Sequence, residues 1–195
     1  MRYHSTRGKQ LTVDSAQAVL NGLAPDGGLY VPEKLPAIDV ENCLKKDTMA
    51  MAAEIIGAML PEIPDMPELV RRAYTGKFET NELTPTVDTG KFTVLELFRG
   101  PTSAFKDVAL CMLPQLLTKA KAKNQMPEDI LILTATSGDT GKAALAGFQD
   151  VEGVRICVFY PHGGVSAVQR AQMVTQEGKN VTVCAVEGNF DDAQT

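Results

Sequence analysis

The side chain best suited to covalent chemistry in this sequence is that of Lys106, in the stretch RGPTSAFKD over residues 99–107. The apolar residues that follow predict a helix over 105–121, which places Lys106 in its first turn. The positive end of a helix dipole disfavours a nearby ammonium group, and burial against apolar neighbours acts in the same direction. A neutral, positioned amine is the group that forms a Schiff base with an aldehyde cofactor. Most helix lysines are surface residues, so the surrounding motifs must decide.

A second motif follows further along the chain. Residues 130–135 form a short apolar run rich in branched side chains, which predicts a buried strand, and residues 142–148 have a helix-forming composition. Between them, residues 136–141 form a turn of small hydrogen-bonding residues. A strand, such a turn and a helix together present backbone N–H groups to an anion. A tight connection without any ligand remains the alternative for this turn taken alone.

The end of this turn, Gly141–Lys142, also occurs in the Walker phosphate loop. That loop has a glycine five residues before its last one, where this chain has Thr136. It also has a serine or threonine after the lysine, where this chain has Ala143. We therefore set nucleotide hydrolysis aside.

The composition is that of an ordinary globular protein and excludes several classes. The 195 residues allow one domain, or one domain and part of a second. A net charge of −5, without clustered lysine and arginine, gives no sign of a nucleic-acid partner. No run approaches the ~18 apolar residues of a membrane helix, and the amino terminus lacks the apolar core of a secretory signal. The sequence predicts a cytoplasmic protein with no membrane or nucleic-acid partner.

The cysteines are far apart, and none belongs to a Cys-x-x-Cys pair. They are Cys43, Cys111, Cys157 and Cys184. This spacing argues against a zinc site and against a disulfide framework, and it suits a reducing compartment. We expect no metal site.

The chain divides into two parts by its pattern. Residues 1–89 have a helical pattern interrupted by loops, including a helix over 15–20 capped by Ser15. Residues 90–195 alternate between strands and helices. The predicted strands cover 92–97, 130–135, 155–160 and 181–186, and the predicted helices cover 105–121, 142–148, 166–175 and 189 onward.

This alternation predicts an α/β fold with right-handed βαβ crossovers and a parallel sheet covered on both faces. Ligands bind at the carboxyl ends of the strands in such sheets. The turn that contains Ser137 lies at such an end, and so does His162, which in its glycine-rich setting is more often a turn residue than an acid–base group.

Four blocks of this sequence, in the same order, resemble the threonine synthase family. The first block is MRYHSTRG with GLAPDGGLYVPEKLP, the second is ELFRGPTSAFKDVAL, the third is TATSGDTGKAALAGF, and the fourth is YPHGGVSAVQRAQM with VEGNFDDAQ. The resemblance covers the chain from Tyr3 to Thr195. It implies a pyridoxal-phosphate (PLP) enzyme of the tryptophan synthase β-like fold, called fold type II. Members of the family are much longer, so it also implies a truncated, amino-terminal fragment.

The resemblance implies an activity and a cofactor. Threonine synthases convert O-phospho-L-homoserine and water to L-threonine and phosphate by γ-elimination and β-hydration. The family's glycine-rich loop for the cofactor phosphate and the hydroxyl that meets the pyridine nitrogen lie further along the chain. We therefore expect the fragment to be inactive alone. No feature of the sequence determines an oligomeric state.

The resemblance also assigns roles to residues. Lys106 is the lysine that binds PLP and moves protons, and Asp139 lies near the phenolic oxygen of the cofactor. The loop residues assigned to the substrate carboxylate are Ser137, Gly138, Thr140 and Gly141. Two alternatives stay open: a related PLP-dependent phospho-amino-acid lyase or hydroxy-amino-acid dehydratase, and a non-catalytic binding module of the same fold. The block over residues 1–36 favours the synthase over dehydratases.

Overall fold

The structure, a computed structural model, describes residues 1–194 and contains two compact units. The first unit comprises residues 1–73 and 115–127, and the second comprises 74–114 and the residues from 128 onward. The sequence pattern divides the chain at 89/90 instead. The two divisions differ because residues after Pro114, in a helix that the pattern assigns to the second part, make their contacts within the first unit.

The first unit contains a three-stranded antiparallel sheet that the sequence did not predict. Its strands are β1 (Arg2–Ser5), β2 (Gly8–Asp14) and β3 (Tyr30–Pro32), in the order β2-β1-β3. The prediction of a mainly helical pattern was wrong here for a physical reason. Strand β2 is short of apolar residues and mostly exposed or half-buried, so it lacks the alternation of a half-buried strand.

The helices of the first unit agree more closely with the sequence. They are α1 (Ser15–Asn21), α2 (Val40–Cys43), α3 (Thr48–Met59) and α4 (Met66–Tyr74), the last of which ends at the first residue of the second unit. The predicted cap of α1 is corrected by one residue: Asp14, not Ser15, accepts a hydrogen bond from the backbone N–H of Gln17, at 2.8 Å. Gly22 ends this helix at φ +67°.

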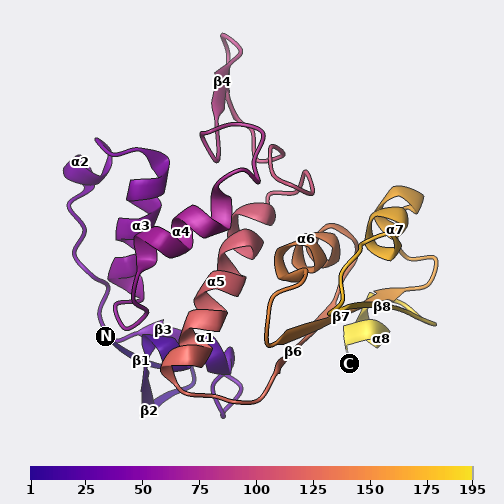
Figure 1. The fold of residues 1–195 in the computed structure, drawn as a ribbon, viewed down its shortest axis with the longest axis horizontal. Coiled ribbons are helices and arrows are strands. Elements are labelled where there is room, and N and C mark those ends of the chain that lie inside the picture. Colours follow the sequence, from indigo (N-terminus) through magenta and orange to yellow (C-terminus); the bar gives the residue numbers. More distant parts are fainter. Residues whose placement is uncertain (195) are drawn as a thin grey trace. The chain divides into compact units, whose positions relative to one another are not determined.

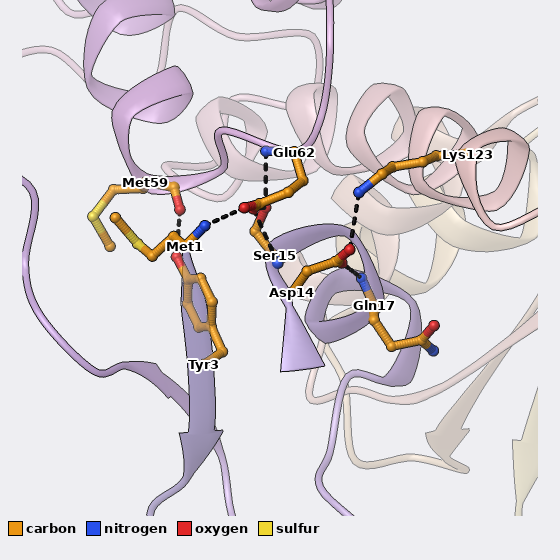
Figure 2. A network of polar contacts seen from close by, with 8 residues as sticks. All are labelled: Met1, Tyr3, Asp14, Ser15, Gln17, Met59, Glu62 and Lys123. Atoms are coloured by element: carbon orange, nitrogen blue, oxygen red, sulfur yellow. Dashed lines mark hydrogen bonds and ion pairs between the residues drawn. The ribbon is translucent and has the colours of Figure 1, made fainter. Parts of the chain in front are cut away.

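A polar network ties the beginning of the chain to the end of α3 (Figure 2). The carboxylate of Glu62 accepts hydrogen bonds from the Ser15 hydroxyl, at 2.5 Å, and from the Met1 ammonium. The Tyr3 hydroxyl donates to the carbonyl of Met59, at 2.5 Å. Burial raises the pKa of Glu62, but the hydrogen bonds from the Met1 ammonium and Ser15 outweigh it and lower the pKa below its usual 4.5.

This network predicts a pH dependence of stability. Because the folded-state pKa of Glu62 is lowered, its contribution is complete above the unfolded value of 4.5 and is lost as the pH falls through the folded value. The free energy of unfolding of the wild type should fall on acidification, and we expect Glu62→Gln to make this fall smaller. Urea denaturation at neutral and at acidic pH measures the difference. The exposed carboxylate of Glu152 gives the control, Glu152→Gln. Equal slopes for the Glu62→Gln variant and the wild type would contradict the prediction.

The second unit contains the predicted parallel sheet (Figure 1). Its strands are β6 (Ile130–Ala135), β7 (Val154–Pro161) and β8 (Val181–Val186), in the order β6-β7-β8. Its helices are α6 (Asp139–Phe148), α7 (Ala167–Val174) and α8 (Phe190–Gln194), and it also contains the start of α5 (Asp107–Lys123). These elements match the predictions for this stretch within about three residues, as expected for element boundaries.

The strand predicted over 92–97 is not part of this sheet. Residues Thr93–Leu95 form the short strand β5, which pairs antiparallel with β4 (Thr86–Asp88) in a separate hairpin. The predicted run contains apolar residues, but they are exposed: Phe92 by 72% and Leu95 by 52%. An apolar run indicates a strand without indicating which strand it pairs with, which explains the error.

Helices cover the two faces of the parallel sheet unequally. Two successive right-handed crossovers in one direction place α6 and α7 on the same face, and Figure 1 shows them together above the sheet as drawn. On that face Ile156 and Val158 are buried beneath α6. On the other face, Leu131 and Leu133 of β6 are 59% and 63% exposed. The prediction of a sheet covered on both faces was therefore wrong at Leu131 and Leu133, which no element among residues 1–194 covers fully.

Among residues 1–194, the helices are too short or too polar to span a bilayer.

The four cysteines are free thiols, and the sulfur atoms of Cys157 and Cys184 lie 3.7 Å apart on neighbouring strands. Burial and the hydrogen bond with Cys184 raise the pKa of Cys157 to about 11, which keeps this thiol protonated at neutral pH.

Candidate active site

Lys106 lies at the amino-terminal end of α5, directly before its first residue, Asp107. Its carbonyl accepts the first helical hydrogen bonds, from the N–H groups of Ala109 at 3.1 Å and Leu110 at 2.9 Å. The side chain is half-buried, and its Nζ atom lies 4.7 Å from the centroid of the Phe105 ring. This is a cation–π contact, and Phe105 is itself 61% exposed. The predicted helix N-terminus is present, and the lysine contacts the apolar ring beside it, although that ring is largely exposed.

The loop before Lys106 is folded around the carboxylate of Asp107, which is 1% exposed. Thr102 donates to it twice, from its hydroxyl at 2.5 Å and from its backbone N–H at 2.8 Å. The backbone N–H of Ala104 adds a longer contact at 3.4 Å. Gly100 passes so close that a Cβ atom there would lie 2.5 Å from the carboxylate. The loop that carries Lys106 is therefore held by the residue that follows it.

Thr102 therefore does not cap the helix of Lys106 as an acceptor. It donates, and the carboxylate in the first turn of the helix accepts. A negative charge at this position is favoured by the helix dipole.

The turn between β6 and α6 is organised by the hydroxyl of Thr136, which is 2% exposed. Its Oγ1 atom accepts hydrogen bonds from the N–H groups of Gly138, at 3.0 Å, and Gly141, at 2.9 Å. Gly138 has a φ of +143°, which favours glycine, and Gly141 approaches β7 so closely that a Cβ atom would lie 2.8 Å from Val158. Both glycines therefore serve the turn itself.

The predicted anion-binding residues are thus brought together in one turn, but their backbone donors are not equivalent. The N–H groups of Gly138 and Gly141 are already bonded to Thr136. Among residues 1–194, the N–H groups of Ser137, Asp139 and Thr140 have no hydrogen-bond partner. These three groups, at the positive end of α6, remain able to bind an anion.

Asp139 is the first residue of α6, and its side chain is exposed at this turn. The Gln169 amide on α7 donates from Nε2 to Asp139 Oδ1 at 2.9 Å. Sequence analysis missed Gln169, although the Ser-x-x-Gln spacing from Ser166 is the signature of a capping box, which the structure contains. The contact with Asp139 had no such signal because it joins residues far apart in the chain.

Helices α5 and α6 approach each other within the second unit, where Gly147, near the carboxyl-terminal end of α6, lies against Leu110 in the first turn of α5. A Cβ atom at Gly147 would collide with the backbone carbonyl of Leu110, so only glycine permits this approach. Lys142 of α6 donates to the side-chain oxygen of Gln176 at 2.5 Å. Burial lowers the pKa of Lys142, with the charge of Asp107 acting in the opposite direction.

The carboxyl ends of the three parallel strands lie at the same edge of the sheet. The turn after β6 lies there, as predicted, and so does His162 after β7. His162 Nδ1 lies 3.2 Å from Glu187 Oε1, and both side chains are exposed. In the part of the chain that the structure describes, no three His, Cys, Asp or Glu side chains come together as a metal site requires.

Comparison with known proteins identifies relatives of the whole chain. Residues 2–74 match the family model described as the threonine synthase N terminus. The threonine synthase of Pseudomonas aeruginosa is 41% identical over 201 residues, which cover 100% of this chain and 42% of the relative. That of Saccharomyces cerevisiae is 36% identical over 98% of this chain and 41% of the relative.

The solved structures agree with these matches. A PLP-bound threonine synthase from Brucella melitensis superposes with a TM-score of 0.89 at 40% identity, over 100% of this chain and 43% of that one. The yeast enzyme also gives a TM-score of 0.89, at 35% identity. The chain spans about two fifths of the length of the curated relatives that it matches. The chain is therefore similar along its entire length, in both sequence and structure, to about two fifths of a threonine synthase.

Proposed function

We propose that this chain is the amino-terminal part of a PLP-dependent threonine synthase of fold type II. The reaction is that of a phosphate-eliminating carbon–oxygen lyase, which converts O-phospho-L-homoserine and water to L-threonine and phosphate. The observation that carries the proposal is the half-buried Lys106 at the amino-terminal end of α5, in the same compact unit as a turn with open N–H donors. The family resemblance and the PLP-bound relative support it.

The residues of this chain suit PLP and an amino-acid substrate. Lys106 supplies the primary amine that the aldehyde of PLP requires, held by the loop around Asp107. The open N–H groups at Ser137 and Thr140 offer donors for the substrate carboxylate, while Gly138 and Gly141 shape the turn. Asp139 would approach the phenolic oxygen of the cofactor.

Each of these groups has a defined task in the proposed reaction. PLP, when bound, supplies an electron sink for the charge that develops when the substrate loses its α-proton. Lys106 holds the cofactor and then accepts and returns protons at its Nζ atom. The turn orients the substrate carboxylate, so that the α-proton faces the lysine.

We propose that the chain alone does not turn over substrate, because it spans about two fifths of its relatives. In this proposal residues 90–195 are the first part of the PLP-dependent α/β domain, residues 1–89 form the amino-terminal domain, and the protein acts in the cytoplasm. Its partner is a small molecule rather than a membrane or a nucleic acid.

The proposal is tested by trapping the cofactor. The chain is incubated with PLP and reduced with borohydride, which fixes a reversible adduct of an aldehyde and an amine, and the labelled peptide is identified by mass spectrometry. We expect the cofactor mass on the peptide with Lys106 and its loss in Lys106→Ala. The control is Lys142→Ala, because the lowered pKa of Lys142 makes it the competing amine. Labelling spread over several lysines and unchanged in Lys106→Ala would overturn the proposal.

A further inference from the structure

The side-chain amide of Gln169 uses both of its ends. Its oxygen accepts from the backbone N–H of Ser166, at 3.1 Å, and its nitrogen donates to Asp139 Oδ1, at 2.9 Å. The first contact belongs to the capping box at the amino-terminal end of α7. The second contact joins α7 to α6, and these two helices belong to different βαβ units. One side chain therefore joins the ends of two helices at the carboxyl edge of the sheet.

The same amide also lies against the backbone of the turn. A Cβ atom built on Gly138 would collide with the amide group of Gln169. Gly138 precedes α6 as its cap residue, and no side chain caps that helix. Gln169 thus occupies the space that the side chain of any other residue at position 138 would fill.

We propose that Gln169 is a positioning residue for the candidate active site. It donates a hydrogen bond to one carboxylate oxygen of Asp139, Oδ1. This contact fixes the direction of the other oxygen, Oδ2, which stays available to a ligand. It also keeps the turn of Ser137 and Thr140 closed. The proposal rests on the proposed function, since positioning matters only if Asp139 and this turn meet the cofactor and the substrate.

The contact can be broken without breaking the capping box. In Gln169→Glu, a carboxylate oxygen still accepts from the N–H of Ser166, as glutamate does in other capping boxes, but the donor to Asp139 is lost. Two carboxylates then face each other. Adding Asp139→Asn restores one hydrogen bond with its direction reversed, from the asparagine amide to the glutamate.

The first readout is the thermal midpoint of the single and double variants. We expect Gln169→Glu to lower the midpoint by roughly 3 °C and the double variant to recover most of that loss. Asp139→Asn alone keeps an acceptor and should change little. Gln10→Glu, at an exposed position, controls for the added charge. Absence of recovery in the double variant would mean that the contact does not exist, whatever the function of the protein.

The second readout is the yield of PLP trapped on Lys106 by borohydride in the same variants. We expect a several-fold lower yield in Gln169→Glu and an unchanged yield in the control Gln10→Glu. Normal trapping in Gln169→Glu, with a recovered midpoint in the double variant, would overturn the positioning role and leave the proposed function intact. Failure of the wild type to label Lys106 would instead overturn the proposed function, and the positioning role with it.

Discussion

Asp107→Ala is expected to lower the free energy of unfolding by about 3 kcal/mol, because it removes two charge-assisted hydrogen bonds worth roughly 1.5 kcal/mol each. Both bonds come from Thr102, and the carboxylate that accepts them is 1% exposed. The variant also leaves the Thr102 N–H buried without an acceptor. Urea denaturation of the variant and the wild type measures the difference. Glu152→Ala, at an exposed carboxylate, is expected to change stability little.

Two more variants separate the contributions of this loop. Thr102→Val removes only the hydroxyl donor, so it should cost about half as much as Asp107→Ala. Asp107→Asn keeps the shape and one acceptor oxygen, and it should fall between the wild type and Asp107→Ala. If the loop also positions Lys106, trapping of PLP on Lys106 should fall in the same order. An Asp107→Ala variant as stable as Glu152→Ala would show that the loop is held by other contacts.

The parallel sheet was predictable because β6 and β7 are near-continuous apolar runs rich in branched residues, a pattern typical of strands in parallel sheets. Such runs are visible in the sequence without any knowledge of the partner strand. Helices α7 and α8 have local signals as well, because Ser166 and Asn189 lie at their amino-terminal ends and accept hydrogen bonds from backbone N–H groups. The antiparallel strands β1 and β2 were not predictable in this way, because neither contains a continuous apolar run.

The candidate site was predictable in its chain positions but not in its bonding. The type and spacing of Lys106 and of the turn at Ser137 were sufficient to select them. The acceptor role of Thr136 depends on the positive φ of Gly138, which the sequence permits but does not impose. The contact of Gln169 with Asp139 depends on how two crossovers lie beside each other, which is a property of the tertiary fold.

Thr136→Val is expected to lower the free energy of unfolding by about 2–4 kcal/mol, because two buried N–H groups lose their acceptor and each costs roughly 1–2 kcal/mol. Valine has nearly the same shape, so the change removes the hydroxyl without creating a cavity. Thr136→Ser is the matched control, since it keeps the hydroxyl and removes only a methyl group, at an expected cost of about 1 kcal/mol.

Hydrogen exchange distinguishes the loss of this acceptor from a general loss of stability. In Thr136→Val, the amides of Gly138 and Gly141 should exchange faster than the loss of global stability alone accounts for, whereas in Thr136→Ser they should follow global stability. The open N–H groups of Ser137 and Thr140 would then lose their fixed directions and hold a substrate carboxylate less well. Trapping of PLP in the presence of an added amino-acid substrate should therefore fall in the valine variant only. Unchanged exchange at both glycines would mean that α6 holds the turn without the hydroxyl. The anion-binding geometry would then be a property of the helix end rather than of Thr136.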